Sequence, residues 1–245
     1  MTPTRRADTP TTARSAADAV RTSVSGSGDR FWKHSDFEHL SALGVATELS
    51  RLARKGELQR VRKGVYYRSA PTAFGPSLPA ATAAAAQALT VPVHPAGLSA
   101  ANLLGLTTQN PLRTELATTA AKPPTALANA SVHTNRPAAR KRLTAREGAI
   151  LEVLRDRANT SDLPPHETAQ RLLEALAQER TYQRLAVAAL AGEPPRVRAM
   201  LGALGQELDV PDRLLTRLRA SLNPLSRFDF GALQALRHAP EWQAK

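Results

Sequence analysis

The chain has 245 residues, and its 33 lysines and arginines against 21 aspartates and glutamates give a formal net charge of +12. This excess favours an anionic partner such as nucleic acid. The absence of cysteine excludes disulfides and cysteine-ligated metal sites. Because the sequence has no apolar run of the ~18 residues that a membrane helix needs and no signal-peptide stretch, we expect a soluble, cytoplasmic protein without membrane contact.

The N-terminal part of the chain predicts a tail followed by a helix. Residues 1–11 are polar and contain proline, so we expect them to be disordered. Residues 12–24 can form a helix with Ala17, Val20 and Val24 on one side. This helix opens a predicted domain that spans residues 12–70.

Residues 31–68 contain two further helix signals. Ser35 and Asp36 can cap the start of a short helix. Residues 41–44 are predicted to form a turn, and a second helix is predicted over 45–55, with an apolar face made of Val45, Leu49 and Leu52. Gly56 can adopt a left-handed conformation and end that helix.

A basic hairpin is predicted directly after the second helix. Residues 58–61 and 65–67 have the composition of strands, and Lys63-Gly64 between them is typical of a tight turn. Helix, turn, helix and a two-stranded wing follow one another in the order of a winged helix-turn-helix domain.

The chemistry of this segment fits DNA. The polar face of the second helix is predicted to reach base edges in the major groove through Thr47, Ser50, Arg51 and Arg54. Phosphate contacts, which supply sequence-independent affinity, are assigned to Lys55, Arg60, Arg62 and Lys63. The other interpretation is a solvated basic face on a small α+β domain.

A second domain is predicted over residues 71–245. Prolines and a glycine between 71 and 79 mark the boundary. Mixed α and β structure is expected to about residue 143, with helices at 80–89 and 98–104 and strands at 90–93, 114–119 and 127–133. The rest is expected to be helical, at 144–157, 166–178, 182–191, 194–208 and 212–222.

Two features of the second domain bear on function. A second basic cluster is formed by Arg136, Arg140, Lys141 and Arg142. It could extend a nucleic-acid footprint, bind an acidic partner protein, or be a solvated loop. The histidines are scattered; His94 and His133 could meet across a sheet, although structural roles are favoured. No catalytic signature is visible, so we expect no enzyme, no metal and no cofactor.

The segment LSRLARKGELQRVRKGVYYR, within residues 31–68, resembles the N-terminal winged helix of AbiEi-type antitoxins. PTAFG (71–75) and GLSAANLLGLTTQNP (97–111) are similar to the start of that family's second domain. The resemblance implies an antitoxin that represses its own operon, with a nucleotidyltransferase-like toxin encoded nearby. It also implies that the winged helix binds double-stranded operator DNA at inverted repeats, whereas the C-terminal domain is needed against the toxin.

We therefore expect an α+β protein with an N-terminal winged helix-turn-helix, followed by a mixed α/β and mainly helical C-terminal antitoxin domain. Binding as a homodimer, or cooperatively on DNA, is compatible with inverted repeats. Two alternatives stay open. One is a stand-alone transcriptional regulator whose C-terminal domain senses a ligand. The other is a nucleic-acid-modifying enzyme with a winged-helix targeting domain, against which the missing catalytic motif argues.

Overall fold

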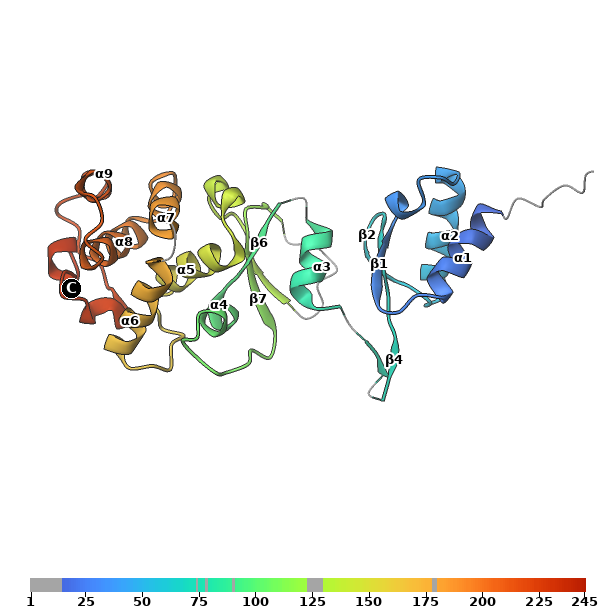
Figure 1. Cartoon of the computed structure of the whole chain (residues 1–245), viewed down its shortest axis with the longest axis horizontal. Helices are drawn as coiled ribbons and strands as arrows, with labels where there is room; N and C mark the ends of the chain where they lie inside the picture. The colour runs from blue at the N-terminus through green and yellow to red at the C-terminus, as the bar shows by residue number, and fades with distance from the viewer. Residues whose placement is uncertain (1–14, 74, 78, 90, 123–129, 178–179) are drawn as a thin grey trace, which may run out of the picture. The chain divides into compact units, whose positions relative to one another are not determined.

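A computed structural model describes residues 15–245 except 74, 78, 90, 123–129 and 178–179 (Figure 1). The tail expected at residues 1–11 lies outside the described residues. The chain divides into two compact units, Met1–Pro79 and Ala80–Lys245. The division therefore lies at the end of the proline-containing segment in which the sequence indicates a boundary.

The N-terminal unit is a winged helix-turn-helix. Its elements are α1 (Ala16–Ser25), β1 (Arg30–Lys33), the 3-10 helix η1 (His34–Phe37), α2 (Ala42–Arg54), β2 (Gln59–Arg62) and β3 (Val65–Arg68). The three strands form an antiparallel sheet in the order β1-β3-β2. Helix α2 and the β2–β3 hairpin correspond to the predicted second helix and wing, and the expected α+β class is confirmed.

The core of this unit fixes the orientation of α2. Val45, Leu49 and Leu52 are buried on one side of the helix, against Val20 and Val24 of α1. The same cluster contains Trp32, Phe37, Leu58 and Tyr66 from the sheet and its connections. Because one side of α2 is buried in this way, its opposite side faces outward.

Two local predictions for residues 30–55 differ from the structure, and one strand in this segment was not expected from the sequence. Residues 41–44 are not a separate turn, because the Ser41 hydroxyl caps the helix, accepting from the Gly44 backbone N–H at 3.5 Å, and α2 begins at Ala42. The short helix expected at Ser35 is the 3-10 helix η1. Strand β1 was not predicted, because it depends on pairing with β3, more than thirty residues away in the sequence.

A short hairpin follows the wing. Strands β4 (Pro71–Thr72) and β5 (Gly75–Pro76) pair antiparallel in the segment where the sequence indicates a domain boundary. The backbone N–H of Ala70 donates to the Ser77 hydroxyl at 2.9 Å, which closes the base of the hairpin. Prolines are tolerated in a two-residue strand of this kind because few of its backbone N–H groups must pair.

The C-terminal unit begins with a small sheet and three helices. Its first elements are α3 (Ala81–Ala88), β6 (Val93–Pro95), α4 (Gly97–Leu103), β7 (Thr114–Thr118) and β8 (Ala130–His133). Strand β7 is central, pairing antiparallel with β6 and parallel with β8. Helix α3 covers one face of this sheet and α4 and α5 (Ala145–Arg155) cover the other (Figure 1).

The remainder is a helical assembly packed around α5 and α8. It comprises the 3-10 helix η2 (Ala138–Arg142), α6 (Pro165–Leu176), α7 (Thr181–Leu190), α8 (Pro195–Glu207), α9 (Asp212–Ala220), η3 (Gly231–Ala235) and η4 (Pro240–Trp242). The Trp242 ring packs on Gly202 of α8, where a Cβ atom would be 2.1 Å from the ring. Within the described residues, no helix has the length and apolar character to cross a membrane.

Candidate nucleic-acid interface

The outward side of α2 carries the residues predicted to meet DNA. Thr47, Ser50 and Arg54 are exposed there, opposite the buried Val45, Leu49 and Leu52. Spacings of three, four and seven residues place side chains on one face of a helix. The structure therefore brings these three predicted residues onto a common surface.

Two of these side chains already have hydrogen-bond partners within the unit. The Thr47 hydroxyl donates to the Leu43 carbonyl oxygen at 2.8 Å, and the Ser50 hydroxyl lies 3.1 Å from the Tyr66 hydroxyl. These contacts hold the two hydroxyl groups against the helix and the sheet. The proton of Thr47 is consequently not available to a base without breaking that bond.

Arg51 is engaged more strongly. Its Nε and Nη2 atoms donate to the Glu48 carboxylate at 2.7 and 2.5 Å, and Arg21 of α1 reaches the same carboxylate at 3.3 Å. Glu48 is only 3% exposed, and the hydrogen bond from Arg51 holds the pKa of the Glu48 carboxyl below its ordinary value. Sequence reasoning missed this pair although an acid three residues before an arginine on a helix is a known signal for it.

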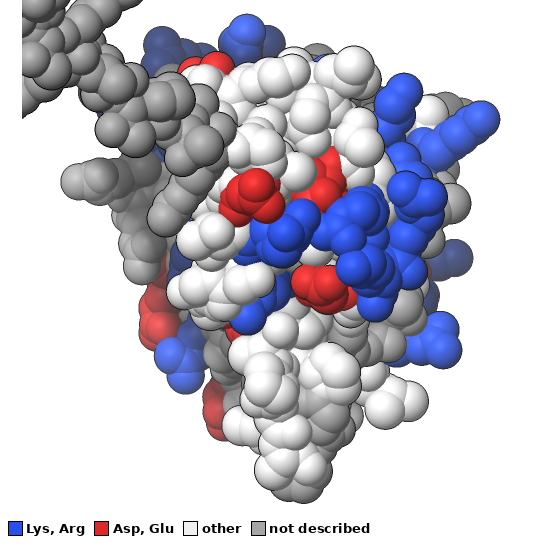
Figure 2. Space-filling model, turned by 90° about the vertical axis from the view of Figure 1, so that its right-hand side faces the viewer, with Lys and Arg blue, Asp and Glu red and all other residues white. Residues whose placement is uncertain are grey.

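The remaining predicted residues are free. Within the described part of the chain, no hydrogen bond or ion pair engages the exposed side chains of Arg54, Lys55, Arg60, Arg62 and Lys63. We call these five residues the free basic set. Side chains alternate along β2, so the burial of Val61 turns its two neighbouring arginines outward. Figure 2, seen from the side of the N-terminal unit, shows Lys and Arg side chains gathered on one face.

The wing owes its shape to a tight turn. Strand β2 ends at Arg62 and β3 begins at Val65, which pair across the two-residue connection. Gly64 has a φ of +79°, a conformation that glycine adopts without steric cost. The turn therefore places Lys63 at the tip of the hairpin, where its ammonium can approach an anion.

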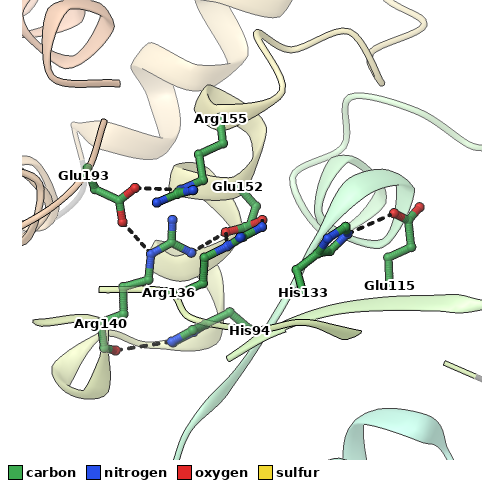
Figure 3. A network of polar contacts seen from close by, with 8 residues as sticks. All are labelled: His94, Glu115, His133, Arg136, Arg140, Glu152, Arg155 and Glu193. Carbon is green, nitrogen blue, oxygen red and sulfur yellow. Dashed lines mark hydrogen bonds and ion pairs between the residues drawn. The ribbon is translucent and has the colours of Figure 1, made fainter. Parts of the chain in front are cut away.

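The second basic cluster lies in a different environment. Arg140 is fully buried, and its Nε atom donates to Glu193 at 2.6 Å while Nη1 contacts Glu152 (Figure 3). Arg136 donates to Glu152 at 2.7 and 2.8 Å, and Arg155 donates to Glu193 at 2.7 Å. The hypothesis of a secondary contact surface is therefore wrong for Arg140, because the core encloses its side chain. Lys141 and Arg142 are exposed.

In this buried network the carboxylates are paired with arginines. Burial raises the pKa of the Glu152 carboxyl, but the hydrogen bonds from Arg136 and the charge of Arg140 outweigh burial and hold the pKa below its ordinary value. The Glu152 carboxylate is thus kept ionised between two arginines. The network joins η2, α5 and the segment before α8, which gives it a structural role.

His94 and His133 do not meet. Each is in register with Ala117 of β7, so the central strand separates them. His94 is buried against Gly148, with Nε2 3.2 Å from the Arg140 carbonyl oxygen, and burial lowers its pKa. His133 lies 3.6 Å from Glu115. Among the described residues, no three acidic or histidine side chains are grouped as a metal site would require.

A groove of about 680 Å³ lies between η2 and α7. Apolar side chains make most of its lining, including Leu143, Val187 and Ala188. Three arginines, Arg142, Arg180 and Arg184, and no carboxylate are among the lining residues that the structure describes. The side chain of Val187, in the lining of this groove, is 50% exposed.

Comparisons with known proteins agree with the expected resemblance. Residues 33–110 match the family model of the transcriptional regulator AbiEi antitoxin N-terminal domain. A crystal structure of the RV2827C protein from Mycobacterium tuberculosis is 18% identical, with a TM-score of 0.50, over 94% of this chain and 90% of that one. This likeness concerns the fold alone. No curated protein matches the sequence.

Proposed function

We propose that this chain, which carries the AbiEi antitoxin N-terminal domain of transcriptional regulators, is an antitoxin that represses its own operon. Helix α2 enters the major groove of the operator, and the β2–β3 wing lies along the phosphate backbone. The C-terminal unit opposes a nucleotidyltransferase-like toxin encoded nearby. The protein acts in the cytoplasm and is not an enzyme.

The observation that carries the DNA proposal is the free basic set. These five cations lie at the end of α2 and on the wing, and within the described residues no carboxylate neutralises them. Lys and Arg side chains that approach phosphates release condensed counterions, which supplies much of the affinity for DNA. A helix between such contacts can be held at the depth where its outward side chains reach base edges.

The predicted site residues have different roles in this proposal. Arg54 lies on the outward face of α2 and can donate two hydrogen bonds to a guanine. Lys55, Arg60, Arg62 and Lys63 contact phosphates. Thr47 and Ser50 lie at the groove with their hydroxyls engaged, whereas Arg51 supports α2 through Glu48. Inverted repeats would be bound by two copies of the chain, as a homodimer or cooperatively.

The test of the DNA proposal combines binding and repression. The full chain is titrated onto its own promoter fragment and onto random DNA of equal length, and a reporter measures promoter activity in the same background. We expect tighter binding to the promoter and lower reporter output. Equal affinity for both DNAs, with an unrepressed reporter, would reject autoregulation.

The groove between η2 and α7 supports the proposal of a protein partner. Its apolar floor matches the apolar side of an amphipathic helix, which is a common way for a groove to bind a peptide segment. Arg142 and Arg180 favour acidic residues on that helix, whereas Arg184 already contacts the Glu147 carboxylate at 3.0 Å. We therefore assign the groove to an acidic amphipathic segment of the toxin.

The toxin proposal is tested by growth rescue. Val187→Asp places a carboxylate on the groove floor, and because Val187 is half exposed the fold should tolerate it. We expect loss of protection when the neighbouring toxin is induced, with promoter binding retained. Leu112→Asp is the matched control, since Leu112 is 99% exposed and outside the groove lining. Full protection by Val187→Asp would move the neutralising surface elsewhere.

A further inference from the structure

Helix α2 has a fourth side chain on its outward stripe, Leu43. Leu43, Thr47, Ser50 and Arg54 are separated by four, three and four residues, which keeps them within one narrow sector of the helix. Leu43 lies in the first turn of α2, and its side chain is 78% exposed. The hydrophobic cluster of the N-terminal unit does not include Leu43.

The hydroxyl groups of this stripe already have hydrogen-bond partners and are not free to recognise bases directly. Thr47 is bonded to the Leu43 carbonyl, Ser50 to Tyr66, and the adjacent Arg51 to Glu48. Within the described residues, only Leu43 and Arg54 project from the stripe without a partner for the end of the side chain. The two therefore differ from their neighbours in being able to meet a ligand without breaking an internal contact.

The position of Leu43 determines what it would meet on DNA. In helix-turn-helix proteins the N-terminal residues of the recognition helix contact base edges in the major groove. The only apolar group that a base presents there is the C5-methyl of thymine, while the other bases present donors and acceptors. A leucine facing those polar edges would remove them from water without replacing their hydrogen bonds.

We propose that Leu43 is a specificity-determining residue that contacts the C5-methyl group of a thymine in the bound site. The inference rests on the proposed DNA-binding function and adds to it a base preference at one position. Arg54, eleven residues further along the same stripe, supplies the polar contact. Recognition by α2 thus combines one apolar and one cationic side chain on a face whose hydroxyls are internally bonded.

The experiment removes the methyl group alone. The full wild-type chain first selects binding sites from random duplex DNA, and each thymine of the enriched site is then replaced singly by deoxyuridine. Burial of one methyl group corresponds to about a fourfold change in affinity. We expect a loss of about that size at one thymine position in each half-site, and smaller changes at the others.

The second half of the experiment is a double-mutant cycle. Leu43→Ala should bind the thymine site more weakly and should show no further loss with deoxyuridine at the sensitive position. Leu43→Met, which keeps an apolar side chain, should retain most of the methyl dependence. Leu112→Ala removes an exposed leucine of the C-terminal unit and should behave as wild type. Circular dichroism verifies that each variant is folded.

The outcomes separate this inference from the proposed function. Two results would overturn the inference and leave DNA binding intact. In one, Leu43→Ala keeps the full wild-type methyl dependence. In the other, no thymine of the enriched site is methyl-sensitive. A change in oligomeric state by Leu43→Ala with unchanged methyl dependence would assign Leu43 to a contact between copies and also overturn it. Failure of the wild-type chain to enrich any sequence would overturn both.

Discussion

Both units contain clusters of basic residues, yet they use them differently. In the N-terminal unit the free basic set lies on the surface, and no carboxylate of the described residues pairs with it. In the C-terminal unit, Arg136, Arg140 and Arg155 surround Glu152 and Glu193 in the interior. A binding surface and a structural network thus differ in whether carboxylates can reach the arginines. The density of charge along the sequence does not distinguish them.

The same distinction operates within α2. Arg51 and Arg54 are one helical turn apart, but only Arg51 has an acid three residues before it. Glu48 therefore holds Arg51 and Arg21 together and joins α2 to α1. Arg54 has no such partner among the described residues and projects from the surface. Neighbouring arginines on one helix can thus serve folding and recognition separately.

The largest expected effect is a loss of stability when Arg140 is substituted. Arg140→Leu leaves Glu152 and Glu193 buried with fewer cations, and breaking a buried ion pair in this way costs about 3–5 kcal/mol. We expect the free energy of unfolding of the C-terminal unit to fall by that amount. Urea denaturation in a Trp32→Phe background isolates the fluorescence of Trp242, which is buried in this unit.

The control for this substitution is Arg142→Leu, two residues away. Arg142 is exposed, so we expect the free energy of unfolding to change by no more than about 0.5 kcal/mol. Equal destabilisation by the two substitutions would show that the buried network does not distinguish them, and the comparison between the units would fail.

The next effect concerns Arg54 and specificity. Arg54→Ala should weaken binding to the selected site by about 1–3 kcal/mol, with a smaller loss on random DNA, if the guanidinium bonds to a base edge. Arg51→Ala should instead lower the stability of the N-terminal unit, because it removes a partner of Glu48. Fluorescence anisotropy on both DNAs and thermal unfolding separate the two variants. Identical losses of Arg54→Ala on both DNAs would restrict Arg54 to phosphate contact.

A similar effect on stability is expected for Glu48→Gln. The variant keeps the size of the side chain but loses the charge that Arg51 and Arg21 share, and hydrogen bonds to charged groups contribute about 1.5–3 kcal/mol. Since the pKa of Glu48 is lowered in the folded state, its contribution is present above the ordinary pKa of a glutamate. It is lost as the pH falls through the lowered value.

The measurement is the free energy of unfolding of wild type and Glu48→Gln from pH 7 to pH 3. The difference between them should be largest at neutral pH and shrink on acidification. Glu57→Gln, at an exposed acid after α2, is the control and should show little difference at any pH. A difference for Glu48→Gln that grows towards low pH would contradict the assigned direction of its pKa.

The smallest effect is expected for single residues of the wing. Arg62→Ala or Lys63→Ala should weaken binding about equally on all sequences, and each should reduce the slope of log K against log salt by about one unit. Stability should be unchanged, because neither side chain has a partner within the described residues. Loss confined to one sequence would indicate a base contact instead.

Sequence reasoning predicted the elements that local signals define. The helix expected from residue 144 is present as α5, which begins with a Thr144–Glu147 capping box, and the Lys63-Gly64 turn forms the wing. Local signals failed where partners are distant in sequence. Strand β1 depends on pairing with β3, and Trp242 packs on Gly202 forty residues earlier.

The candidate site shows the same limit. Periodicity alone predicted which side of α2 faces outward, because the buried residues recur with the helical repeat. It could not separate Arg51 from Arg54 without considering Glu48, and it could not place Arg140 in the core, because Glu193 is 53 residues away. The sequence predicts a turn at Leu43, whereas α2 begins at Ala42 and includes this residue on its outward stripe.

The central claim is that the free basic set of the N-terminal unit binds DNA phosphates. It is tested most directly by the salt dependence of the full chain's affinity for its selected site, for wild type and two triple variants. Arg60→Ala/Arg62→Ala/Lys63→Ala removes three cations of the wing, and Lys141→Ala/Arg142→Ala/Arg146→Ala removes three exposed cations of the C-terminal unit. We predict that the slope falls by about three units in the first variant and stays at the wild-type value in the second. An unchanged slope in the wing variant, or an equal fall in both, would contradict the account.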